Sequence, residues 1–182
     1  MALRPVLQFP DRRLKQVSEP VARVTDEIRE LARDMLDVMY DEPGIGLAAP
    51  QLGAPVRLIV VDVHWNEEGA ERNPRVLVNP EIVESSGTIT WNEGCLSVPD
   101  FQAEVERAER VRLRATDLDG NPVEIEASEL EAVCFQHEID HLDGILFIDR
   151  ISRLKRSMYA RRREKQLRQE REDEEAGSQT AV

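Results

Sequence analysis

Two histidines stand four residues apart in the segment Gln136-His137-Glu138-Ile139-Asp140-His141. If this segment is helical, one turn separates His137 from His141, so both imidazoles lie on one face and could bind the same divalent metal ion. Glu138 projects about 100° round the helix, beside such an ion rather than onto it. A metal ion with an open coordination position lowers the pKa of its bound water to ~7, and a neighbouring carboxylate can carry that proton to a leaving amine. The pattern therefore predicts hydrolytic chemistry with Glu138 as the proton carrier.

The surroundings of this motif favour a metal site over a chance occurrence of H-E-x-x-H. The chain contains three His, and two of them are in the motif. Ser128 and Glu131 have the spacing of a capping box at a helix start, and Gly144 stands where a C-terminal cap belongs. We therefore expect a rigid helix that presents both imidazoles.

Two His leave a catalytic metal site incomplete, so a third ligand must come from elsewhere in the chain. The candidates are Cys95, Cys134, His64 and Glu164. Cys134 lies on the same helix face, but ~10 Å of axial rise separates it from residue 141, and its Cβ tilts away toward the N-terminus. We interpret Cys134 as pocket or core lining, and His64, at the end of an apolar strand, as part of a surface turn. Cys95 is the better candidate, and Glu164 remains the alternative.

Three motifs follow one another along the chain: G-x-G-L-A-A-P-Q from Gly44 to Gln51, E-G-C-L-S from Glu93 to Ser97, and Q-H-E-x-D-H-L-x-G from residue 136. In this order and at this spacing they resemble the motifs of the peptide deformylases. The likeness covers most of the chain, from Val6 to beyond residue 147. One such motif alone is weak support for a family, whereas three in register are strong support.

The resemblance implies a metal centre. In that family the Cys of the second motif and both His of the third bind the ion, which here means Cys95, His137 and His141. It also implies Fe²⁺ as the active form. By the Irving–Williams order such a site holds Zn²⁺ more tightly than Fe²⁺, so Zn²⁺ or Ni²⁺ in purified protein would be compatible with an iron enzyme.

The resemblance also assigns catalytic and substrate-binding residues. Glu138 is the proton shuttle, and the side chain of Gln51 and the backbone N–H of Leu96 donate hydrogen bonds to the developing oxyanion. Such neutral donors stabilise the charge without competing for the metal. The substrate backbone would run beside the glycine-rich chain like an added strand. The implied substrate-binding residues are Ile45, Gly46, Trp91, Gly94, Leu130, Val133 and Cys134.

One position departs from the family pattern. Many bacterial relatives have a basic residue shortly after the E-G-C-L-S motif that contacts the substrate backbone, whereas this chain has Gln102. A Gln side chain donates hydrogen bonds but carries no charge. We expect weaker reliance on a terminal carboxylate in short substrates.

The elements that must position the motifs read as short strands around helices. Apolar residues at helical spacing behind Thr25 predict a helix over 25–41. Buried strands are predicted at 56–63 and 75–79, and a hairpin joins 111–115 to 123–126. The expected fold is α+β, with short antiparallel sheets around the central metal-binding helix and a helix near each end of the chain.

The C-terminal part is strongly charged. Residues 152–171 predict a basic helix, and residues 172–182 an acidic and polar tail that should be disordered. By composition alone the helix is a solvated surface element, but the resemblance implies docking on the ribosome. Its basic residues are Arg153, Lys155, Arg156, Arg161, Arg162, Arg163, Lys165 and Arg168.

Length and composition narrow the remaining possibilities. The chain of 182 residues suits a single catalytic domain, 1–171, followed by the tail. A net charge of -12 disfavours general nucleic-acid binding. Two Cys suit a reducing compartment, and neither a signal peptide nor a membrane span is predicted. We expect a cytoplasmic monomer that has no contact with membranes.

Three classes of function compete. The first is a metal-dependent amidase that removes the formyl group from the N-terminal formyl-Met of newly synthesised polypeptides. The second is an H-E-x-x-H zinc endopeptidase with Glu164 as third ligand, although Glu164 stands among basic residues on a solvated helix. The third is a binding protein with a structural metal, which generally requires four protein ligands. A Cys95→Ser variant separates the first two, because it loses metal only if Cys95 is a ligand.

Overall fold

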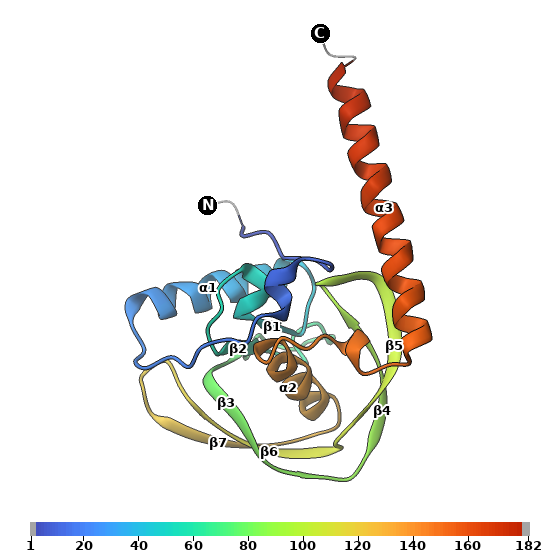
Figure 1. Cartoon of the computed structure of the whole chain (residues 1–182). Coiled ribbons are helices and arrows are strands. Elements are labelled where there is room, and N and C mark those ends of the chain that lie inside the picture. The colour runs from blue at the N-terminus through green and yellow to red at the C-terminus, as the bar shows by residue number, and fades with distance from the viewer. Residues whose placement is uncertain (1–2, 180–182) are drawn as a thin grey trace.

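Helix α2 (Glu129–Leu142) lies at the centre of the structure, enclosed by strands on several sides (Figure 1). The computed structural model describes residues 3–179, with side chains as far as residue 176. A five-stranded sheet and a two-stranded hairpin, both antiparallel, surround α2. The predicted α+β class is confirmed. Among the described residues no helix is long and apolar enough to cross a membrane.

The larger sheet has the strand order β1-β2-β3-β6-β7. Its strands are β1 (Gly46–Ala48), β2 (Leu58–Val61), β3 (Arg75–Ser86), β6 (Arg110–Thr116) and β7 (Pro122–Ser128). The predicted hairpin is therefore β6–β7, and both predicted buried strands are present. The third strand of the sheet extends well beyond the predicted end at residue 79.

Strand β2 is buried on both faces, which is why its sequence is an unbroken apolar run. Ile59 and Val61 belong to the core that includes the central helix, whereas Leu58 and Val60 belong to a second core with α1 (Asp26–Asp41). The sheet thus carries one helix on each face. Because α2 packs against β1 and β2, the glycine-rich first motif lies beside the H-E-x-x-H helix.

The second motif lies in a hairpin that sequence patterning did not predict. Strands β4 (Ile89–Cys95) and β5 (Val98–Arg107) pair with each other, and Cys95 stands at the turn opposite Val98. Ala103, Val105 and Arg107 alternate inward along β5. The arginine at one of these inward positions interrupts the alternation of apolar and polar residues by which a strand is predicted.

Helix α2 begins and ends where the sequence predicted. Ser128 is its N-cap, and Gly144 after its C-terminus has a φ of 72°, which favours glycine. The predicted capping box is absent, because Ser128 makes no side-chain cap bond and Glu131 accepts a hydrogen bond from Arg75 Nε at 2.8 Å. Packing between the sheet and the hairpin therefore fixes this helix.

Helix α3 (Arg153–Gln179) runs farther than the predicted 152–171. The segment expected to be disordered from residue 172 is helical as far as residue 179, and residues 180–182 lie outside the described part of the chain. Glu and Ala in this stretch are strong helix formers, and Gln169 Nε2 donates to Asp173 Oδ1 one turn on, at 2.9 Å. Local propensity thus accounts for the greater length of the helix.

The base of α3 is anchored on the body of the protein, whereas its outer half projects away from it (Figure 1). The hydroxyl of buried Tyr159 donates to Pro99 O at 3.2 Å. Arg163 is 7% exposed, and its Nη2 donates to Gln8 Oε1 at 2.8 Å. Arg163 is therefore part of the packing and not of the basic surface predicted for this helix.

Candidate metal centre and active site

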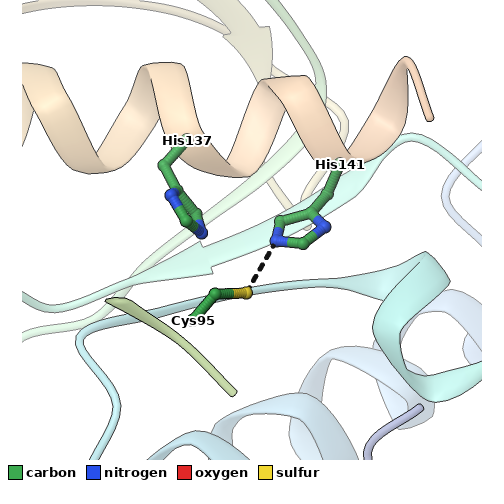
Figure 2. A group of neighbouring side chains, drawn as sticks. All are labelled: Cys95, His137 and His141. Atoms are coloured by element: carbon green, nitrogen blue, oxygen red, sulfur yellow. Dashed lines mark hydrogen bonds between the residues drawn. The ribbon is translucent and has the colours of Figure 1, made fainter. Parts of the chain in front are cut away.

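Cys95, His137 and His141 come together at one point, with their potential ligand atoms all within 4.8 Å of one another. Figure 2 shows both imidazoles on the same side of α2, facing the cysteine at the end of β4. Cys95 Sγ lies 3.2 Å from His141 Nε2. Burial and the neighbouring His137 hold the pKa of His141 well below its usual range. His141 is therefore a neutral imidazole, the form that binds a metal.

A buried carboxylate fixes the orientation of His137. Its Nδ1 lies 2.8 Å from Glu93 Oε2, so the imidazole donates that N–H to the carboxylate, while the ring faces Cys95 (Figure 2). Such a partner holds the ring orientation and raises the basicity of a ligand nitrogen. Glu93 belongs to the second motif, but no role was predicted for it from the sequence.

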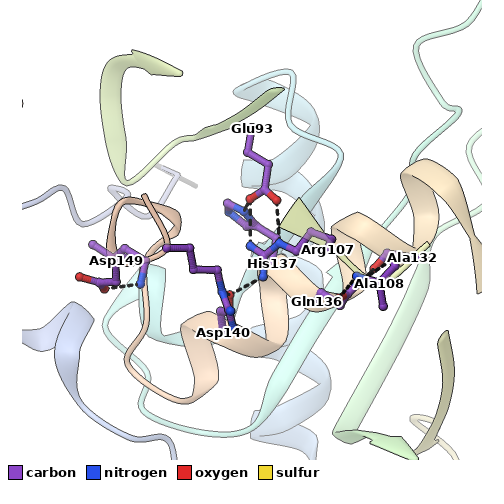
Figure 3. Close-up of polar contacts among 10 residues, drawn as sticks. Glu93, Arg107, Ala108, Ala132, Gln136, His137, Asp140 and Asp149 are labelled. Atoms are coloured by element: carbon purple, nitrogen blue, oxygen red, sulfur yellow. Dashed lines mark hydrogen bonds and ion pairs between the residues drawn. The ribbon is translucent and has the colours of Figure 1, made fainter. Parts of the chain in front are cut away.

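Arg107 joins Glu93 to the central helix (Figure 3). Its Nε and Nη2 donate to the two carboxylate oxygens of Glu93 at 2.7 and 2.9 Å, and its Nη1 donates to Asp140 Oδ2 at 2.6 Å. Asp140 also accepts hydrogen bonds from Arg150 at 2.5 Å. Burial opposes ionisation of Glu93, yet the hydrogen bonds from Arg107 and His137 lower its pKa to about 2. The network therefore keeps Glu93 charged.

Gln136, also drawn in Figure 3, fixes the same helix from another side. Its Oε1 accepts from Ala108 N, and its Nε2 donates to Ala108 O, both at 2.9 Å. This amide pairing ties α2 to the connection between β5 and β6. The first residue of the third motif thus has a structural part in placing the histidines.

Glu138 lies beside the three potential ligands and close to β1. It is 4% exposed, and its Oε2 has no hydrogen-bond partner among residues 3–179. Burial raises its pKa to about 7. A Cβ added to Gly46 would lie 2.5 Å from Glu138 Oε1 and 2.7 Å from Cys134 Sγ, so only glycine allows β1 to approach this closely.

Gln51 has a defined amide orientation. Its Oε1 accepts from Ala48 N at 2.8 Å, and its Nε2 lies 3.1 Å from Ser97 Oγ and 3.6 Å from Cys95 Sγ. The NH₂ group therefore lies beside Cys95, as a donor to an oxyanion formed there would require. Ser97 is a further contact in this arrangement for which no role was predicted from the sequence.

A cavity of about 460 Å³ opens beside these groups. All seven predicted substrate-binding residues line it, together with Gln51, Leu96, Glu138 and two of the three potential ligands. Asn92 and Gln102 border it as well, and Asn92 Nδ2 donates to Gln102 Oε1 at 2.9 Å. Cys134 is buried, as expected of a lining residue, and burial raises the pKa of its thiol.

The alternative ligands lie apart from this group. His64 is exposed and pairs with Glu67 at 2.6 Å, which agrees with the predicted surface turn. Glu164 is exposed on α3. Within residues 3–179, the one set of three or more side chains able to hold a metal ion is Cys95, His137 and His141.

The fold and this site define a class: an α+β protein with an H-E-x-x-H helix and a cysteine from a neighbouring hairpin, arranged as in a metal-dependent hydrolase. A family model described as polypeptide deformylase matches residues 3–157. The chain therefore belongs to the polypeptide deformylase family.

Relatives and solved structures agree with this assignment. A peptide deformylase of Rhodopseudomonas palustris (strain BisB5) is 55% identical over 91% of this chain and 95% of its own length. One from Alkalilimnicola ehrlichii is 56% identical over 94% of each chain. A crystal structure of a peptide deformylase from Legionella pneumophila has a TM-score of 0.84 at 45% identity, covering 93% of this chain and 98% of its own. One from Ehrlichia chaffeensis in complex with actinonin has a TM-score of 0.85 at 37% identity, covering 91% and 98%.

The predicted enzyme class is thus confirmed. The family consists of metal-dependent hydrolases that remove the N-terminal formyl group from nascent polypeptides, and this chain shares that activity. The endopeptidase alternative is not favoured.

Proposed function

We propose that Cys95, His137 and His141 hold one divalent metal ion and that Glu138 moves the proton during deformylation. The observation that carries this proposal is the group of three potential ligands beside a buried carboxylate oxygen without a partner. One cysteine sulfur and two imidazole nitrogens form a ligand set that suits Zn²⁺ or Fe²⁺. Three protein ligands also leave one coordination position of the metal ion open, as in catalytic sites.

When bound, such an ion lowers the pKa of a water molecule and polarises the formyl carbonyl. Glu138 takes the proton of the attacking water as its oxygen bonds to the formyl carbon. The C–N bond then breaks, and Glu138 passes the proton to the departing α-amine, so that formate and a free N-terminus leave. A pKa of about 7 suits a group that must both accept and donate a proton near neutral pH.

The neutral donors act on the formyl oxygen. Because Oε1 of Gln51 is occupied by Ala48 N, its Nε2 is oriented to donate as negative charge develops on the oxygen. The backbone N–H of Leu96, next to Cys95, is proposed as the second donor. Removing one donor of this kind typically costs ~10²- to 10³-fold in turnover.

The lining of the cavity supports a formyl-Met substrate. Trp91, Leu130 and Val133 offer an apolar lining to the Met side chain, with Ile45 and Cys134 beside them. Gly46 and Gly94 leave room for the substrate backbone, which would run beside Gly44–Gly46 as an added strand.

Formate release from a formyl-Met tripeptide tests the proposal. Glu138→Gln should retain stoichiometric metal yet lose nearly all turnover, whereas Cys95→Ser should lose the metal itself. His64→Asn is the matched control for histidine content, because His64 is exposed and outside the group. Substantial turnover by the Glu138→Gln protein, or full metal content after the Cys95 change, would contradict the assigned roles.

We further propose Fe²⁺ as the active metal. Affinity favours Zn²⁺, but reactivity depends on how readily the ion accepts the formyl oxygen as an added ligand. Metal analysis combined with activity after anaerobic reconstitution separates the two. Higher turnover with Zn²⁺ than with Fe²⁺ would refute the iron assignment.

We also propose that the enzyme is a cytoplasmic monomer that docks on the ribosome through α3. A cytoplasmic location is proposed because nascent chains are made there. Sedimentation at micromolar concentration tests the monomeric state, because it would reveal a dimer. Deleting the whole helix would remove Tyr159 and Arg163 from the core, so charge reversal is the sharper test of docking. Replacing the exposed residues Arg161, Lys165 and Arg168 by Glu should abolish salt-sensitive co-sedimentation with ribosomes and leave deformylation of a short peptide intact. Unchanged co-sedimentation would contradict docking through α3 and leave it as a solvated surface helix.

A further inference from the structure

The connection between β2 and β3 contacts the glycine-rich wall of the cavity through one aromatic residue. Trp65 Nε1–H donates to the carbonyl oxygen of Gly44 at 2.8 Å. Gly44, Ile45 and Gly46 all line the cavity. The neighbouring side chains in this connection are exposed, whereas Trp65 is half-buried.

Two further contacts hold Trp65 in place, and they continue into a chain of contacts that returns to Ile45. Its ring packs edge-on against Tyr40 of α1 with centroids 5.1 Å apart, and the guanidinium of Arg72 lies 4.0 Å from the Tyr40 centroid and 5.6 Å from that of Trp65. The Tyr40 hydroxyl donates to Asp62 Oδ2 at 2.8 Å. The backbone N–H of Asp62 in turn donates to the carbonyl oxygen of Ile45 at 2.9 Å.

These contacts fix two successive peptide planes at the cavity wall. A trans peptide is planar, so its carbonyl and N–H point in opposite directions. Holding the Gly44 oxygen therefore also directs the N–H of Ile45 away from Trp65. Glycines at 44 and 46 leave the backbone unusually free, so the orientation of this donor depends on contacts from outside the segment.

We infer that Trp65, Tyr40 and Arg72 form a clasp that positions the substrate-binding segment Gly44–Gly46, which leads into β1, for pairing with the formyl peptide. Trp65 is a positioning residue, because it acts through the main chain of Gly44 and Ile45. The inference rests on the proposed pairing of the substrate with this segment. The clasp predicts lower substrate affinity when it is opened and leaves the proton transfer by Glu138 untouched.

Trp65→Phe keeps an aromatic ring against Tyr40 and removes the N–H donor. One neutral hydrogen bond contributes ~0.5–1.5 kcal/mol, so KM for a formyl-Met tripeptide should rise roughly 3- to 10-fold. The value of kcat and the metal content should stay within about 2-fold, as expected when only binding is weakened. Amide hydrogen exchange in a peptide covering residues 43–48 should become faster.

Two further variants sharpen the test. Tyr40→Phe retains the ring but releases Asp62, so it should accelerate the same exchange and raise KM by a smaller factor, even if Trp65→Phe does not fold. His64→Asn removes the exposed pair with Glu67 in the same connection and should change neither.

Unchanged KM and unchanged exchange in both clasp variants would overturn the inference. A fall in both kcat and melting temperature would also overturn the inference, because the two together indicate general destabilisation. If the unaltered protein releases no formate, the proposed function fails instead, and hydrogen exchange still tests the clasp.

Discussion

Replacing Arg107 by Met should destabilise the protein strongly, although Arg107 does not line the cavity. The side chain is 2% exposed and donates two hydrogen bonds to Glu93 and one to Asp140. Without it, Asp140 keeps Arg150, but Glu93 keeps only His137. Removing one partner of a buried ion pair typically costs ~3–5 kcal/mol, because the other charge stays buried without compensation.

The pKa of Glu93 gives a similar magnitude. It is about 2 in the folded protein against 4.5 ordinarily, and this difference corresponds to ~3 kcal/mol of folding free energy. A carboxyl group with a lowered pKa stabilises the folded state fully above its unfolded pKa, and this contribution disappears as the pH falls through the folded value. The deficit of the variant should therefore be complete at pH 7 and shrink between about pH 4.5 and pH 2 in metal-free protein.

Urea denaturation at pH 7 measures the loss, and competition with a chelator measures metal affinity. We expect a loss of ~3 kcal/mol and metal binding weakened ~10- to 100-fold, because His137 loses its fixed orientation. Arg112→Met is the matched control, since its side chain is 34% exposed and pairs with exposed Glu84 and Glu124, where solvent screening leaves an ion pair little effect on stability. A loss at Arg107 no larger than at Arg112 would refute the reasoning.

Other substitutions at the site give further predictions. In metal-free protein, the stability of Glu138→Gln relative to the parent should increase by up to ~3 kcal/mol as the pH rises from 5 to 8. The reason is that a carboxyl whose pKa is raised to about 7 makes the parent less stable as the pH rises above 4.5. An equal stability difference at pH 5 and pH 8 in urea denaturation would contradict this. Gly46→Ala should lower kcat at least ~10-fold with metal retained, because its Cβ meets Glu138. Gly44→Ala, whose Cβ approaches nothing closer than 3.4 Å, should lose less in the same formate assay. Gln102→Arg should raise kcat/KM more for formyl peptides with a free carboxylate than for amidated ones, and equal gains would show that position 102 does not sense that charge.

The sequence predicted the parts of the site that lie on one element or within one short motif. His137, Glu138 and His141 share a helix, so their relative directions follow from helix geometry alone. Comparison of the candidate ligands favoured Cys95 but left Glu164 open. Only the family resemblance assigned Cys95 as the ligand, because no local rule states that the end of β4 faces α2. The structure brings all four together, and the resemblance supplied the long-range information that spacing lacks.

The predictions that failed did so for two different reasons, one of tertiary context and one of local propensity. Strand β5 was not predicted because Arg107 occupies an inward position, and an arginine is buried only where carboxylates from other elements meet it. The α3 boundary was misjudged for the opposite reason. Charge composition suggested disorder after residue 171, whereas local helix propensity and side-chain pairs such as Gln169–Asp173 suffice to continue the helix.

The register of the β4–β5 hairpin explains why the residues supporting the metal centre escaped prediction. Glu93 pairs across the hairpin with Ala103, and a register shift separates this pair from the one between Cys95 and Val98. Arg107, four residues beyond Ala103, reaches back to Glu93 and onward to Asp140. Glu93 then orients His137, which comes from α2. Predicting these supporting residues would require the hairpin register, the ion pair and the helix face to be predicted together. The useful sequence signal is a charged residue at an inward strand position, because such a residue needs a buried partner of opposite charge.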